Sequence, residues 1–143
     1  MTHSPNMTRF RVERRPDPST AEERSAALLA PGFGKIFTDH MVVIKWSETG
    51  GWGEPVVMAR GPFLIDPAAS VLHYAQEIFE GLKAYRGPSG EVLLFRPEQN
   101  ARRFAASAKR MAMAELPEGL FVEAVKILTA IDHAWVPEAP GSL

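Results

Sequence analysis

Residues 72–86 read Leu72-His-Tyr-Ala-Gln-Glu-Ile-Phe-Glu-Gly-Leu-Lys-Ala-Tyr-Arg86, and the rest of the chain is organised around them. The large aromatic residues of this stretch are Tyr74, Phe79 and Tyr85. Gly81 separates the last two and interrupts any regular helix. A turn and then a segment with two adjacent arginines follow. An aromatic stretch that leads into a basic helix predicts an apolar pocket beside an anion-binding site.

Periodicity predicts the elements around this stretch. Residues 70–78 are predicted to form a short helix capped by its serine. Residues 82–86 and 91–96 pair as a hairpin through the turn Gly87-Pro-Ser-Gly90. Pro97 suits the first turn of the next helix. The apolar stripe of that helix is Ala101, Phe104, Ala105, Ala108, Met111 and Ala112.

A second amphipathic helix is predicted to open at Pro117 and to end at Pro137. Its apolar residues recur at helical spacing and predict one buried face. That predicted face is Phe121, Ala124, Val125, Leu128, Ile131 and Trp135. These two helices, each with one apolar stripe, are expected to lie on the strands.

Two strands are predicted ahead of the central stretch, at residues 41–47 and 55–60. The segment Glu48-Thr-Gly-Gly51 supplies a hairpin turn between them. Trp46 and Trp52 could serve as ligand platforms. We prefer to assign both to the core, because large aromatic side chains near a hairpin usually pack inside.

The N-terminal segment looks peripheral. Residues 1–17 hold few large apolar side chains and are expected to be mobile, apart from a short edge strand at Phe10 and Val12. Ser19-Thr-Ala-Glu22 fits a capping box, with a second register one residue later. The short helix that follows ends at Pro31-Gly32.

Composition sets broad limits on function. The 143 residues are 45% apolar and 23% charged, with a formal net charge of -1, as in an ordinary globular domain. This charge gives no indication of nucleic-acid or membrane binding. The chain has no cysteine, which excludes disulfides, thiolate metal sites and a cysteine nucleophile. No apolar run has the length of a membrane span or a signal core, so we expect a cytoplasmic location.

The histidines give no metal site. His3, His40, His73 and His133 lie far apart and lack ligand spacing, so zinc is not expected. Asp39 and His40 are neighbours and could form an acid–base pair. We prefer the interpretation that they cap and orient each other in a loop.

Other candidate residues each admit two interpretations. Arg102 and Arg103 lie near a helix start, where they could hold a phosphate or simply form a solvated face. The three aromatic side chains of the central stretch either line a pocket or belong to the core. Lys83 would form a Schiff base only if it were desolvated, and in a strand it is expected to reach solvent.

Several further motifs occur in a fixed order around the central stretch. They are Phe37-Thr-Asp-His-Met41, Gly51-Trp52, Leu94-Phe-Arg-Pro97, Asn100 with Arg103, and Ala134-Trp-Val-Pro137. Together they make the chain similar to the N-terminal part of a branched-chain amino-acid aminotransferase, a pyridoxal-phosphate enzyme of fold type IV. The resemblance implies an α/β fold of the α+β type, with helices packed on a mainly antiparallel sheet. It places this small domain at residues 32–143, after an N-terminal extension at residues 1–31, with the large catalytic domain absent.

The resemblance also implies roles for particular residues. It implies that Arg103 binds the phosphate of pyridoxal 5'-phosphate and that Phe79 lines the pocket for the branched side chain. Tyr74 is expected to reach the active site of the neighbouring subunit in a homodimer. The implied reaction moves an amino group between leucine, isoleucine or valine and 2-oxoglutarate.

The resemblance covers a part of the enzyme that contains no catalytic residue. The lysine that would hold the cofactor has no counterpart among the five lysines of this chain. The chain alone is therefore expected to be inactive, to retain no cofactor, and to self-associate through an uncovered apolar face. The remaining alternatives are another fold-type IV enzyme, such as a D-amino-acid aminotransferase or an aminodeoxychorismate lyase, and a non-catalytic binding or assembly module. The residues from Phe79 to Tyr85, with Thr38-Asp-His40, favour the branched-chain group.

Overall fold

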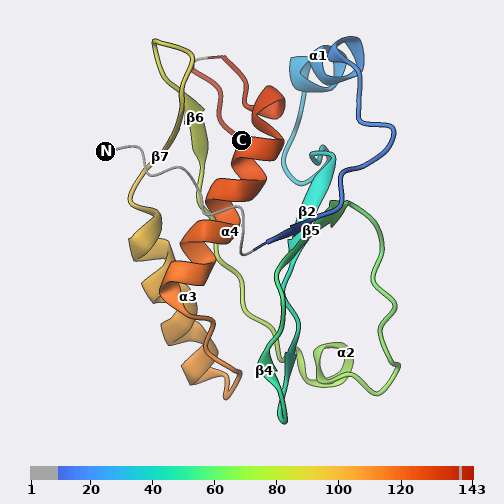
Figure 1. Cartoon of the computed structure of the whole chain (residues 1–143), viewed down its shortest axis with the longest axis vertical. Coiled ribbons are helices and arrows are strands. Elements are labelled where there is room, and N and C mark those ends of the chain that lie inside the picture. The colour runs from blue at the N-terminus through green and yellow to red at the C-terminus, as the bar shows by residue number, and fades with distance from the viewer. Residues whose placement is uncertain (1–9, 139) are drawn as a thin grey trace.

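The structure of this chain is a computed structural model that describes residues 10–138 and 140–143. A small sheet and two long helices, α3 and α4, lie side by side (Figure 1). The expected α+β class with mainly antiparallel pairing is confirmed. The boundary expected at residue 31 stays a prediction. Expectations for residues 1–9 lie outside the part of the chain that the structure describes.

The main sheet has three strands in the order β1-β5-β2. Strand β2, His40–Val43, pairs antiparallel with β5, Val56–Ala59. Strand β1, Arg11–Val12, adds to β5 in parallel, so the predicted short edge strand is confirmed. Phe10, immediately before it, is buried in the core. The expectation that the described part of residues 1–17 is peripheral is therefore wrong at this position.

The strand predicted over residues 41–47 is broken into two. Strand β3, Trp46–Ser47, leaves the main sheet and pairs with β4, Gly51–Trp52, as a separate hairpin. The turn is as predicted, and Gly51 adopts a φ of 67°, which glycine tolerates without a Cβ clash. Trp52 packs half-buried against the core, whereas Trp46 is 49% exposed. The core assignment of Trp46 is wrong because its strand turns away from the sheet.

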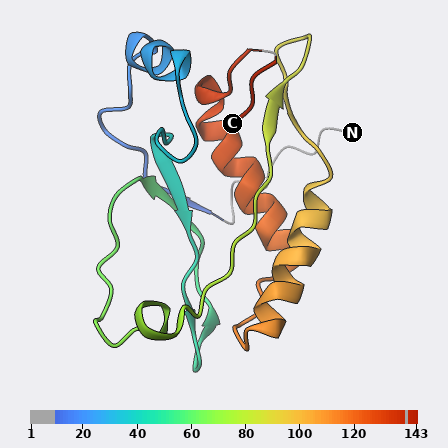
Figure 2. The same ribbon diagram turned by 180° about the vertical axis from the view of Figure 1, so that it is seen from behind.

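The helix predicted over residues 70–78 is shorter than expected. Helix α2, Ser70–Tyr74, ends where Ala75 takes a left-handed φ of 48°. Its N-cap is Ala69 rather than the serine. The chain then runs without regular structure to the hairpin of β6, Ala84–Arg86, and β7, Val92–Leu94. Figure 2 shows this connecting segment passing in front of α4.

Helix α3, Pro97–Arg110, begins at the proline as predicted, and α4, Glu118–Ile131, follows Pro117. The last predicted turns of α4 are a separate 3-10 helix, η2, His133–Trp135. Helix α1, Ala21–Leu29, is confirmed, with the capping box in the second register, from Thr20 to Glu23. The first register is wrong: Thr20 is the N-cap, and the hydroxyl of Ser19 donates to Asp39 at 2.7 Å.

The core lies between α4 and the main sheet. Val57 and Ile127 are completely buried, and they cluster with Phe10, Leu116 and Leu120. The predicted buried face of α4 is only partly right. Trp135 is buried, but the positions from Phe121 to Ile131 on that face are half-buried. The fully covered positions of α4 are Leu120, Val122 and Ile127, and of these Leu120 and Ile127 belong to the core cluster that includes Val57 of the sheet.

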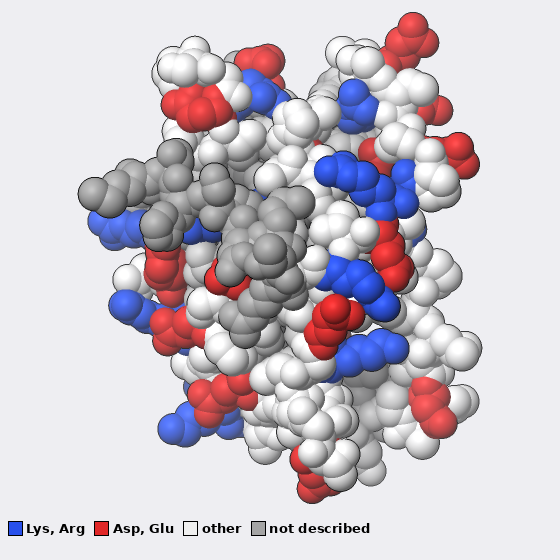
Figure 3. All heavy atoms as spheres, in the orientation of Figure 1, with Lys and Arg blue, Asp and Glu red and all other residues white. Residues whose placement is uncertain are grey.

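The surface shows no block of one charge on the face seen in Figure 3, where basic and acidic side chains alternate over the described residues. This agrees with a net charge of -1. Across residues 10–138 and 140–143, none of the helices combines the length and the apolar character needed to cross a bilayer.

Candidate functional site

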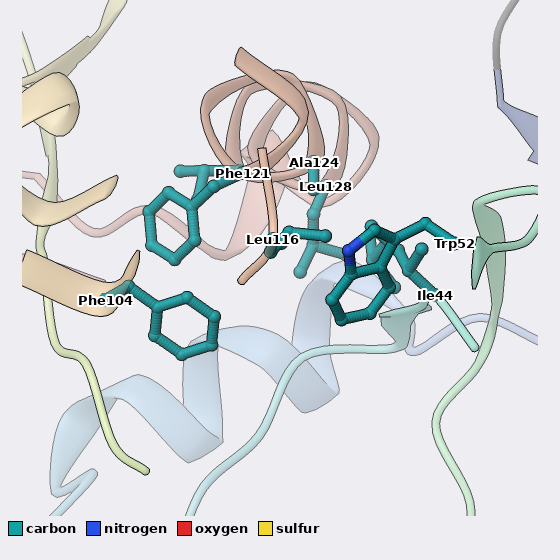
Figure 4. A pocket seen from close by; sticks show the side chains of 9 residues that line it. Ile44, Trp52, Phe104, Leu116, Phe121, Ala124 and Leu128 are labelled. Atoms are coloured by element: carbon teal, nitrogen blue, oxygen red, sulfur yellow. The ribbon is translucent and has the colours of Figure 1, made fainter. Parts of the chain in front are cut away.

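Two adjoining hollows follow the half-buried face of α4. The first has a volume of about 340 Å³, and Figure 4 shows its apolar lining, which includes Trp52, Phe104 and Phe121. The rings of Phe104 and Phe121 lie 5.2 Å apart and close it on the helix side. Val125 and Leu128 line both hollows. The face of α4 predicted to be buried is therefore the floor of an apolar groove.

The second hollow has a volume of about 350 Å³ and lies against the central stretch of the sequence. Its wall is formed by Phe79, Glu80, Gly81 and Leu82, which come from the irregular segment ahead of β6. Further lining comes from α4 and the residue that follows it, and includes Thr129 and Asp132. An apolar hollow with a few polar groups at its edge is the usual form of a small-molecule site.

A charged cluster stands at the wall of this second hollow. The Nε of Arg103 donates to Oε2 of Glu80 at 2.7 Å, and its Nη2 donates to Oε1. The amide of Asn100 also donates to Glu80, at 3.0 Å, and to the carbonyl of Gly81, at 2.9 Å. Helix α3 places Asn100 and Arg103 on one face because they are three residues apart.

The electrostatics of the pair favour the charged form of both groups. The two hydrogen bonds from Arg103 lower the pKa of Glu80 to about 2, against the opposing effect of burial. The same contact raises the pKa of Arg103. Each of these shifts favours the charged form of its group, so Glu80 stays ionised at neutral pH. The Arg103 side chain is 68% exposed, whereas that of Glu80 is 3% exposed.

The structure separates the two arginines that the sequence left equivalent. Arg102 pairs with Glu118, at 3.5 Å, with both side chains largely exposed. It belongs to the solvated helix face. Arg103 instead binds Glu80, a residue that lines the second hollow.

The aromatic residues of the central stretch are not brought together. Tyr74 ends α2, whereas Tyr85 belongs to β6, and Figure 1 shows these elements at opposite ends of the molecule. All three side chains are exposed, so assigning them to the core is wrong. Phe79 alone of the three lines the second hollow. Lys83 is exposed, as predicted for a strand-like position.

Asp39 and His40 do not bind each other. The Nδ1 of His40 contacts Asp132 at 2.7 Å, and its Nε2 accepts from the backbone N–H of Arg15 at 2.9 Å. Because Nε2 is an acceptor, Nδ1 carries the ring proton. Both side chains are buried, so this pair ties β2 to the end of α4. The expectation that the two neighbours orient each other is wrong, because successive residues entering a strand point to opposite sides.

Asp39 forms a second buried anchor. Burial would raise its pKa, but hydrogen bonds from Trp135 and Ser19, together with the charge of Arg15, outweigh that effect and lower it. The Trp135 indole donates to Oδ2 at 2.9 Å, and the Ser19 hydroxyl donates to Oδ1. This network joins the segment before α1 to the 3-10 helix after α4.

Replacing Asp39 by asparagine is expected to lower the free energy of unfolding by about 1–3 kcal/mol. An amide offers one acceptor oxygen, so its NH₂ group must face either Trp135 or Ser19, both of which donate. Urea unfolding followed by circular dichroism measures the change. The exposed Asp17→Asn removes the same charge and serves as the control. Equal stability of both variants would mean that the network contributes nothing.

Sequence reasoning missed Glu80, Asn100 and Asp132 as members of these clusters. Asn100 was noticed only as part of a family motif, and its spacing from Arg103 was the available signal. For Asp132 the sequence held no such signal, since its partner His40 lies 92 residues away. Within the described residues, no three histidine or acidic side chains gather in a way that could hold a metal ion.

The chain matches known proteins closely, but over part of their length. It is 53% identical over 137 residues to a probable branched-chain-amino-acid aminotransferase of Streptomyces coelicolor, covering 94% of this chain and 38% of that protein. It is 50% identical to the branched-chain-amino-acid aminotransferase of Mycolicibacterium smegmatis, covering 92% of this chain and 36% of the relative. It is 43% identical to the branched-chain-amino-acid transaminase 1 of Bacillus subtilis, covering 91% of this chain and 34% of that relative.

This chain is homologous to the N-terminal part of branched-chain aminotransferases. The resemblance inferred from the motifs is confirmed at that level. The chain spans a little over a third of the length of the curated relatives it matches. No protein-family model matches the chain.

Proposed function

We propose that this chain is the cofactor-phosphate and side-chain-pocket part of a branched-chain aminotransferase. The reaction moves an amino group between leucine, isoleucine or valine and 2-oxoglutarate. The observation that carries the proposal is the exposed guanidinium of Arg103, which binds Glu80 where Glu80 and Phe79 line an apolar hollow. The names of the relatives supply the substrate class.

The donor set at Arg103 fits a phosphate. A guanidinium has five N–H bonds, and Glu80 uses the one on Nε and one on Nη2. The remaining donors lie on the exposed side of the group and suit bidentate contact with phosphate oxygens. Pyridoxal phosphate, when bound, supplies the electron sink for chemistry at the amino-acid α-carbon. In this proposal Arg103 holds its phosphate at the edge of the hollow.

The hollow fits an aliphatic side chain. Phe79, Leu82 and Leu128 give it an apolar lining, and Phe79 is 86% exposed, so its ring is available for contact. Such a lining favours branched hydrocarbon over a charged carboxylate. Discrimination by an apolar pocket is about 1–3 kcal/mol per methylene.

The same proposal includes a homodimer and a cytoplasmic location. Tyr74 is 82% exposed at the end of α2 and could reach a neighbouring subunit. A line of exposed apolar residues at Phe63, Leu64 and Ile65 would be covered in such an assembly.

The experiment uses a chimera in which this chain replaces the matching segment of the Streptomyces coelicolor relative. The chimera is assayed with L-leucine and 2-oxoglutarate, with D-alanine, and with aminodeoxychorismate. Glutamate formation from L-leucine alone supports the proposal. Turnover of D-alanine or of aminodeoxychorismate would favour one of the other fold-type IV enzymes. An inactive chimera beside an active unaltered relative would favour a non-catalytic module.

In the same chimera, Phe79→Ala is expected to lower kcat/KM for leucine, isoleucine and valine about tenfold more than for glutamate. The ring is proposed to contact the branched side chain, which glutamate lacks. Steady-state kinetics with each amino donor measures the ratio. Leu93→Ala, at an exposed apolar position outside the hollow, is the control. Equal losses for all four donors would remove Phe79 from the pocket.

A further inference from the structure

Glu80 is held more firmly than a surface carboxylate normally is. Its Oε1 accepts from the backbone N–H of Gly81 at 2.9 Å and from Asn100, while Arg103 donates to both oxygens. Its side chain is 3% exposed, although the arginine that it binds is 68% exposed. The carboxylate therefore lies inside the cluster, and the guanidinium lies outside it.

We propose that Glu80 is a permanent positioning residue that grips one edge of Arg103 and turns the other edge towards an incoming phosphate. This inference rests on the proposed role of Arg103 in phosphate binding. It adds Glu80 to the phosphate site, and it predicts that this acidic side chain strengthens anion binding although it carries a negative charge.

A ligand phosphate is not expected to displace Glu80. Displacement would leave a nearly buried carboxylate without its two strongest donors, which is costly for an ionised group. The hydrogen bonds from Arg103 lower the pKa of Glu80 to about 2, so the group is charged at neutral pH, where phosphate is an anion. The pair therefore persists, and the phosphate meets the donors that Glu80 leaves free.

Asn100 binds both the side chain of Glu80 and the backbone next to it. Its amide donates both to Glu80 and to the carbonyl of Gly81, so the loop and helix α3 are joined at two points. A long arginine side chain loses rotamer freedom when it is ordered. Here the protein fold meets that cost before the ligand arrives, which is how preorganisation raises affinity.

The positioning role and simple charge repulsion predict opposite effects of neutralising Glu80. If the carboxylate acts only as a nearby negative charge, Glu80→Gln should tighten phosphate binding. If it positions Arg103, Glu80→Gln should weaken binding. The amide NH₂ of glutamine would face an arginine donor and release the guanidinium.

The experiment titrates this chain with inorganic phosphate, takes the Kd from the shifts of backbone amide signals by NMR, and follows the Nε–H signal of Arg103 in the variants that keep the arginine. The Kd of Glu80→Gln is expected to rise about tenfold. In Glu80→Gln, the Nε–H of Arg103 should also exchange faster with solvent. A merely structural role of Glu80 would not make this exchange rate and the Kd for phosphate change together. Glu77→Gln removes an exposed charge three residues earlier and should leave the Kd within about twofold.

Asn100→Ala keeps Glu80 and is the second variant if Glu80→Gln unfolds, as judged by circular dichroism. An intermediate rise in Kd is expected. Unchanged or tighter binding in Glu80→Gln, or in Asn100→Ala where that variant carries the test, overturns the positioning role. If Arg103→Gln nevertheless abolishes the shifts of the backbone amide signals, only the positioning role of Glu80 is overturned, and the phosphate role of Arg103 stands. A Kd that Arg103→Gln leaves unchanged, or no response of Arg103 in the unaltered chain, overturns the phosphate role as well.

Discussion

Replacing Arg103 by glutamine is expected to weaken pyridoxal-phosphate binding to the chimera by about thirtyfold or more. The guanidinium is proposed to make charge-assisted hydrogen bonds to the phosphate, and glutamine offers neither the charge nor the planar fork. Its loss also leaves the Glu80 carboxylate close to the phosphate without its counter-charge. Titration of the cofactor-free chimera, followed by cofactor fluorescence, gives the Kd.

Arg102→Gln is the matched control for this measurement. It removes the same charge from the adjacent residue, whose guanidinium pairs with Glu118 on the solvated face. Its effect on the Kd is expected to stay within about threefold. Similar losses in both variants would show that the helix contributes only a general positive potential. Melting temperatures of both variants separate a lost contact from a lost fold.

Ile127→Ala is expected to lower the free energy of unfolding of this chain by about 2–5 kcal/mol. Its side chain is fully buried in the cluster between α4 and the main sheet. Truncation removes buried hydrocarbon and leaves a cavity that neighbours such as Val57 fill only in part. A loss of this size is a large share of the stability of a small domain.

Urea unfolding measured by circular dichroism tests this second expectation. Leu29→Ala removes the same number of heavy atoms at the end of α1, where the side chain is 86% exposed, and should cost less than about 0.5 kcal/mol. A small effect of Ile127→Ala would place the core elsewhere, on the face of α4 that the sequence pattern predicted.

The regular elements were predictable where local signals dominate. The proline at the start of α3, the hairpin between β6 and β7, and the order of strands and helices all follow from turn residues and periodicity. The buried face of α4 was not, because both sides of the helix are apolar. Only the position of the sheet decides that Ile127 is covered while Leu128 lines a groove.

The candidate site was predictable only in part. A basic residue on a helix start and an aromatic residue on a loop were visible in sequence as Arg103 and Phe79. The partner of Arg103 was not, since Glu80 lies 23 residues earlier and looked like an ordinary acidic residue. The buried pair of His40 and Asp132 was equally hidden, because its contact forms only when β2 packs against the end of α4.

The most direct test of the central claim is a crystal structure of the chimera with pyridoxal phosphate bound. We expect the phosphate within about 2.7–3.1 Å of the free guanidinium nitrogens of Arg103. We also expect the guanidinium to remain paired with Glu80, and the ring of Phe79 to face the reacting side of the cofactor. A phosphate bound away from Arg103, with the Glu80 pair facing solvent, would contradict the account.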